Sequence, residues 1–215
     1  MTDQSDLPTL TPAEARILGC LIEKKLLTPD VYPLTLNAAQ AAANQKTARE
    51  PVMALEQGEI HHALKTLGEK ELVRQVFGSR VERYEHTMAQ RFSLTTPQTA
   101  LIGLLLLRGP QTAYELLARS ERMARFQSAE DLKNELDMLI GKRPALVKEI
   151  GRGPGQREDR FAHLLSGDVE VSAFIPAAVA TGAAGSTAVA ELEARVAALE
   201  EQVAKLTARL DTLGG

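Results

Sequence analysis

The chain has 215 residues, with 25 Lys and Arg against 28 Asp and Glu and a formal net charge of −3, so it is mildly acidic and long enough for one or two domains. Hydrophobic residues make up 44% but aromatic residues only 4%, which favours a helical core of Leu, Ile, Val and Ala. The single cysteine, Cys20, excludes an intramolecular disulfide framework and a multi-cysteine zinc site, and it predicts a reducing, cytoplasmic location without a signal peptide.

The first part of the chain predicts three helices followed by two strands. Thr11-Pro12-Ala13-Glu14 combines an N-cap, a proline at the first helical position and a glutamate that completes a capping box. A second, short helix is expected at residues 36–43 after Thr35. The extended patterns of residues 72–76 and 80–86 predict a β-hairpin. The inward positions of the first and third helices are Ile17, Leu18, Leu21, Ile22, Ile60, Leu64 and Leu67.

The same order recurs further along the chain. Thr96-Pro97-Gln98 predicts the start of a second long helix, and residues 113–119 after Thr112 predict a second short one. Residues 145–150 and 160–165 then predict another hairpin. The inward positions in this half are Leu101, Ile102, Leu105, Leu106, Leu132, Leu136 and Leu139.

Three helices followed by a β-hairpin is the order of a winged helix, a relative of the helix-turn-helix motif. The expected fold is therefore mainly α with small β-hairpin wings (α+β): two tandem winged-helix domains followed by a C-terminal coiled-coil helix. We expect the domains at residues 1–86 and 87–165, a flexible Ala/Gly linker at residues 166–188 and the coiled coil at residues 189–213.

The C-terminal part has two contrasting patterns. Residues 171–190 contain no charged residue, but their Ala, Gly and Pro content predicts a linker and no membrane span. The heptad repeat that follows favours a parallel two-stranded coiled coil and hence a homodimer, with an amphipathic helix folded back on its own domain as the alternative. The predicted dimer positions are Val189, Leu192, Val196, Leu199, Val203, Leu206, Leu210 and Leu213.

Basic residues are distributed unevenly along the chain. Residues 1–86 carry 10 basic and 12 acidic side chains, whereas residues 87–165 carry 12 basic and 9 acidic ones. The clusters of the second half are candidates for phosphate contacts, with a solvated surface paired to nearby acids as the alternative. Acidic side chains surround the third helix of each half, which argues against DNA on those helices. The candidates on the third helices and in the second half are Lys65, Arg119, Arg122, Arg125, Lys133, Arg152, Arg157 and Arg160.

The segment of residues 44–52, between the second and third helices, adds a second group of candidates. Asn44 and Gln45 can hydrogen-bond base edges, and Lys46 and Arg49 can contact phosphate. The alternative is a long loop whose Asn and Gln bond its own backbone, while Pro51 and Val52 anchor it to the core.

Three stretches resemble a known family. They are Pro33-Leu34-Thr35-Leu36-Asn37, Asn44-Gln45-Lys46-Thr47-Ala48-Arg49-Glu50-Pro51-Val52 and Arg80-Val81-Glu82-Arg83-Tyr84-Glu85-His86. Over nearly the whole region before the linker, the chain resembles the YceH family of uncharacterised bacterial proteins. The central motif departs from the family pattern NQKSNRDPV at Thr47, Ala48 and Glu50. The resemblance implies tandem winged helices and a role in binding DNA or protein.

No set of residues predicts catalysis, a metal site or a cofactor. His61 and His62 are adjacent on a helix and diverge by about 100°, so they cannot face one metal ion. The stretch Gly151 to Gly155 lacks the Lys-Ser/Thr ending of a phosphate loop. We therefore expect a non-enzymatic, dimeric protein that binds double-stranded DNA, as a transcription regulator does. The alternative is an adaptor whose winged helices bind a protein partner.

Overall fold

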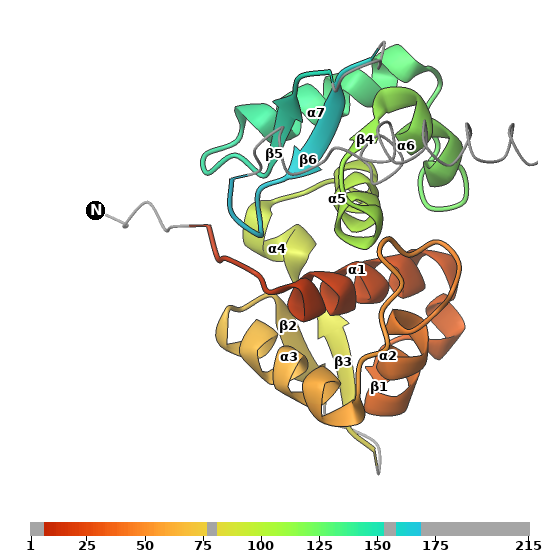
Figure 1. Cartoon of the computed structure of the whole chain (residues 1–215), viewed down its shortest axis with the longest axis vertical. Helices are drawn as coiled ribbons and strands as arrows, with labels where there is room; N and C mark the ends of the chain where they lie inside the picture. The colour runs from red at the N-terminus through yellow and green to blue at the C-terminus, as the bar shows by residue number, and fades with distance from the viewer. Residues whose placement is uncertain (1–6, 77–80, 153–157, 169–215) are drawn as a thin grey trace, which may run out of the picture. The chain divides into compact units, whose positions relative to one another are not determined.

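The computed structural model describes residues 7–76, 81–152 and 158–168 (Figure 1). Contacts divide the chain into Met1–Val171 and Ser172–Gly215. The second unit, with the predicted coiled coil and most of the predicted linker, lies outside the described residues. Within the described part the fold is mixed α+β, and none of its helices is long and apolar enough to cross a membrane.

The first repeat, residues 12–86, has the expected order of elements. In chain order these are α1 (Pro12–Leu27), the 3₁₀ turn η1 (Pro29–Val31), β1 (Leu34–Thr35), α2 (Leu36–Ala43), α3 (Gln57–Glu69), β2 (Val73–Val76) and β3 (Arg83–His86). Thr11 accepts from the Glu14 backbone N–H at 3.3 Å, and the Glu14 carboxylate accepts from the Thr11 N–H at 2.7 Å, so the predicted capping box is confirmed.

The second repeat, residues 96–163, follows the short helix α4 (Met88–Phe92). It consists of α5 (Thr96–Arg108), β4 (Gln111–Thr112), α6 (Ala113–Ser120), α7 (Ala129–Gly141), β5 (Val147–Ile150) and β6 (Arg160–His163). The N-cap of α5 is Thr95, one residue before the predicted start, because only Thr95 has Gln98 at the N3 position of the capping box.

Each repeat closes its hairpin into a three-stranded antiparallel sheet, in the orders β1-β3-β2 and β4-β6-β5. The outer strands β1 and β4 were not predicted, because two residues are too short to give a period. One arginine on each middle strand ties it to this edge: Arg83 donates to the Pro33 carbonyl at 2.8 Å, and Arg160 to the Pro110 carbonyl at 3.0 Å. The repeats therefore match in detail as well as in element order.

The core runs between the repeats, where α1 and α5 make the most extensive contact of any two elements (Figure 1). Both helices are buried on all sides over ten consecutive residues, Glu14 to Glu23 and Gln98 to Leu107. A glycine in each helix permits the close approach. A Cβ on Gly19 would lie 2.9 Å from Leu107 Cγ, and one on Gly103 would lie 2.6 Å from Ile22 Cγ2.

Candidate nucleic-acid interface

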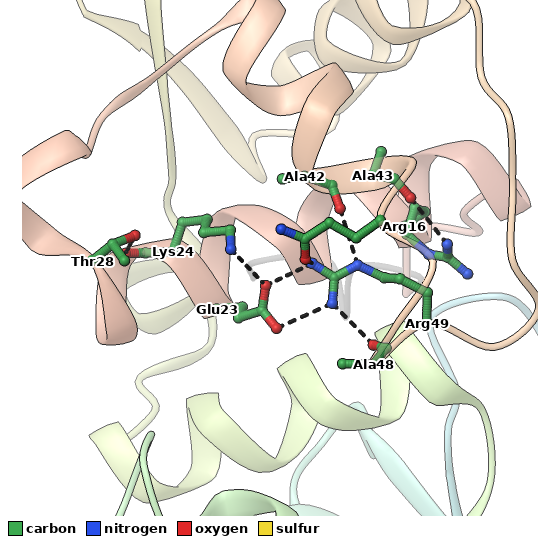
Figure 2. Close-up of polar contacts among 9 residues, drawn as sticks. Arg16, Glu23, Lys24, Thr28, Ala42, Ala43, Ala48 and Arg49 are labelled. Carbon is green, nitrogen blue, oxygen red and sulfur yellow. Dashed lines mark hydrogen bonds and ion pairs between the residues drawn. The ribbon is translucent and has the colours of Figure 1, made fainter.

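Arg49, a predicted phosphate contact, lies inside the protein beside α1 (Figure 2). Its side chain is fully buried, and its Nη1 and Nη2 donate to the two carboxylate oxygens of Glu23 at 3.0 and 2.6 Å. The other three N–H groups donate to the Ala42 carbonyl, the Ala48 carbonyl and the Gln45 side chain at 3.0, 2.9 and 2.8 Å. Since a guanidinium has five N–H donors, Arg49 retains none for a phosphate in this arrangement.

Glu23 and Arg16 on α1 complete this buried polar group, termed the Arg49 cluster (Figure 2). Burial raises the pKa of Glu23, but the hydrogen bonds and charge of Arg49, with help from Lys24, outweigh burial and lower the pKa below its ordinary value. Arg16 donates through Nη1 to the Ala43 carbonyl at 3.2 Å and through Nη2 to the Pro51 carbonyl at 2.5 Å. The cluster thus fixes the loop between α2 and α3 to α1.

The remaining polar residues of this loop also bond the protein itself. The Asn44 amide pairs with the backbone of Leu55, donating at 2.9 Å and accepting at 2.8 Å. These bonds match the alternative in which Asn and Gln serve the loop's own structure. The prediction that Pro51 and Val52 anchor the loop to the core is wrong. Both residues are exposed, Val52 by 58%, and the apolar anchor is the buried Leu55. Lys46 alone of the four predicted residues projects into solvent.

Three arginines predicted to contact phosphate in the second repeat are engaged with other protein groups. Arg119 donates to the Gln111 side chain at 2.5 Å and lies 3.9 Å from Glu115, whose other oxygen is 3.0 Å from Arg160 Nη1. On the hairpin, Arg152 Nε lies 3.2 Å from an Asp159 carboxylate oxygen. Arg157 lies outside the described residues. The pairing of arginines with nearby acids, weighed as the alternative, is therefore present at these three positions.

Five predicted cations are exposed and form no ion pair with any other described residue: Lys46, Lys65, Arg122, Arg125 and Lys133. Their surroundings differ. Lys133, on α7, lines a small hollow of about 160 Å³ together with Glu149, Glu158 and Asp159. Acidic groups thus dominate the neighbourhood of Lys133, which disfavours a phosphate there.

The outward side of α3 has a different character. Ile60, Leu64 and Leu67 are buried, so α3 turns a set of polar side chains to solvent. Glu59 at its start folds back to accept from the Glu56 backbone N–H at 2.8 Å. We call the solvent-exposed polar side of this helix the α3 face. Its residues are Gln57, Gly58, His61, His62 and Lys65.

Burial holds two histidines and the cysteine in their neutral forms. Burial lowers the pKa of His86 to about 3 and that of His163 to about 4, so both imidazoles are neutral at pH 7. Burial also raises the pKa of the Cys20 thiol to about 11, so this buried thiol is protonated at pH 7. Across the described ranges, no group of three His, Cys, Asp or Glu residues is arranged to hold a metal ion.

The chain is thus an α+β protein with two matching repeats, and its sequence matches a known family. The profile of the family described as "Protein of unknown function, DUF480" matches residues 10–156, and the chain belongs to this family. A UPF0502 protein of Mesorhizobium japonicum is 74% identical over 98% of this chain and 99% of its own length. UPF0502 proteins of Xanthomonas axonopodis pv. citri and Stenotrophomonas maltophilia are 54% and 48% identical over the full length of both chains.

Proposed function

We propose that this protein is a non-enzymatic, dimeric DNA-binding protein built from two tandem winged helices, in keeping with its resemblance to the YceH family. The observation that carries the proposal is the α3 face. In a winged helix the third helix enters the major groove. Here that helix presents the imidazoles of His61 and His62 and the ammonium of Lys65 between Glu59 and Glu69, and the Glu59 carboxylate is turned back onto the Glu56 backbone N–H.

The chemistry of the α3 face suits a duplex. Gln57 can donate to and accept from base edges, and Lys65 can contact a phosphate or a guanine. Gly58 has open space where a Cβ would be, so its presence is not required by the protein's own packing. A helix without a side chain at that point allows a sugar-phosphate backbone to come close. Gln57 also donates to Asn37 on α2 at 2.8 Å, which holds it at the start of the face.

The test is the affinity for a labelled random-sequence duplex, followed by fluorescence anisotropy at several salt concentrations. We expect affinity to fall steeply with salt, because phosphate contacts release counterions. Lys65→Ala should weaken binding about tenfold at low salt and reduce the salt slope by about 1.

The matched control is Lys133→Ala, which removes the same charge from α7. It should change DNA affinity less than about twofold, because acids already surround Lys133. No binding at low salt would exclude the proposed function, and equal losses in the two variants would remove α3 from the interface.

We also propose that residues 189–213 form the dimer. Leu199 occupies a d position of the heptad repeat, so Leu199→Asp would place a carboxylate in the apolar seam. The expected result is a fall in mass from dimer to monomer in sedimentation equilibrium. Ala197→Asp, at the outward b position two residues away, should remain dimeric. An unchanged mass for Leu199→Asp would refute the coiled coil.

A further inference from the structure

We propose that the outward side of α7 is a docking surface for a protein partner that presents a cationic amphipathic helix. The α7 face, as we term it, is centred on Met138, which is 65% exposed. Beside it lies a hollow of about 700 Å³. The hollow is lined by Gln98, Asn134, Glu135, Asp137, Met138, Gly141 and Lys142.

The two repeats provide an internal comparison, because α3 and α7 are both 13 residues long and bury large apolar side chains at three corresponding positions. Ile60, Leu64 and Leu67 correspond to Leu132, Leu136 and Leu139, so the outward positions correspond as well. Where α3 has Lys65 and Thr66, α7 has Asp137 and Met138. Where α3 has Gly58, α7 has Glu130. At these positions the surface is polar and cationic in one copy but acidic with an apolar centre in the other, whereas Lys133 of α7 stands where α3 has His61.

A second exposed apolar residue lies on α6, beside Lys133 of α7. Tyr114, on α6, is 60% exposed and lines the hollow that also contains Lys133. Its counterpart in the first repeat is Asn37, at the same position of α2. Met138 and Tyr114 are the two most exposed large hydrophobic side chains in the described part of the chain. Both replace polar residues of the first repeat, and tyrosine and methionine are enriched at protein interfaces.

The charges around these residues specify the partner. Glu130 and Asp137 on α7 form no ion pair with another described residue, and Glu149 and Glu158 lie on the Tyr114 side. Carboxylates in this number repel a phosphate backbone and attract lysine and arginine. An apolar stripe flanked by basic residues would cover Met138 and Tyr114 and oppose the acids. This inference does not depend on DNA binding, since it concerns the other repeat.

The probe is an 18-residue helical peptide of Leu and Lys, with Leu along one stripe, and its matched peptide with Glu in place of Lys. Binding of each to the full chain is followed by fluorescence anisotropy at 0.15 M salt. We expect the Lys peptide to bind and the Glu peptide not to bind. Met138→Lys and Asp137→Lys should each weaken binding of the Lys peptide about tenfold.

Two controls carry the same charge changes elsewhere. Val31→Lys, at a site that is 57% exposed, and Glu69→Lys, on α3, should alter peptide affinity less than about twofold. Equal binding of the two peptides, no binding of the Lys peptide, or equal losses in all four variants would overturn the proposal. Reduced DNA affinity in Asn134→Ala would also overturn it, because α7 would then contact DNA.

Discussion

Arg49→Met should lower the free energy of unfolding by about 3–5 kcal/mol, the range expected when one partner of a buried ion pair is removed. The Glu23 carboxylate would keep Lys24 at 3.4 Å but lose both of its bonds to the guanidinium. The carbonyls of Ala42 and Ala48 would lose a donor at the same time. Chemical denaturation at pH 7 measures the effect.

The loss of stability in Arg49→Met should depend on pH. In the wild type the pKa of Glu23 is lowered, so its stabilising contribution is present above about pH 4.5 and is lost as pH falls below that value. Without Arg49, burial would raise the pKa of Glu23, and the folded variant would take up a proton more readily than the unfolded chain. The difference between variant and wild type should therefore shrink as the pH is lowered from 7 towards 4.5.

Two further variants distinguish the effect of losing this ion pair from the effect of losing any positive charge. Lys46→Met removes a cation from the exposed part of the same loop and should change stability by less than about 0.5 kcal/mol. The double variant Arg49→Met/Glu23→Leu should regain part of the loss, because no buried charge is left unpaired. If Arg49→Met were as stable as Lys46→Met, the Arg49 cluster would not anchor the loop.

The sequence predicted those features of the fold that depend on residues close together in the chain. The cap at Thr11, the short helices after Thr35 and Thr112, and the inward positions of α3 and α7 all follow from side chains within one or two turns. The strands β1 and β4 could not be predicted in this way. Each is defined only by pairing with a strand far along the chain, as Leu34 is with Tyr84.

The Arg49 cluster shows why the candidate site was harder to predict. Arg16, Cys20 and Glu23 have the spacing of one helix side, and this polar stripe on an otherwise apolar helix was a usable signal. Its meaning depended on α5, which covers another side of α1 and leaves the stripe facing the α2–α3 loop. Without that contact, an arginine in a polar loop is predicted on the surface, as Arg49 was.

The second large predicted effect on stability concerns the contact between α1 and α5. Overpacking a core usually costs about 1–3 kcal/mol, so Gly103→Ala should destabilise the protein by up to about 2 kcal/mol after the gain in helix propensity is subtracted. The added methyl would lie 2.6 Å from Ile22 Cγ2 and 3.3 Å from Ile22 Cβ, so the Ile22 side chain or one of the two helices must shift. This cost opposes a gain of about 1 kcal/mol in helix propensity.

The matched control separates these two terms. Gly58→Ala gains the same propensity on α3, where nothing lies within 4 Å of the new Cβ, so it should stabilise the protein by about 0.5–1 kcal/mol. Opposite signs for the same substitution would show that steric contact decides the outcome at Gly103. Adding Ile22→Ala to Gly103→Ala should cost less than the two single changes together, because the new methyl fills space that Ile22 vacates. Additive losses, or a stabilised Gly103→Ala, would mean that the helices can separate without cost and that the repeats are not held by this contact.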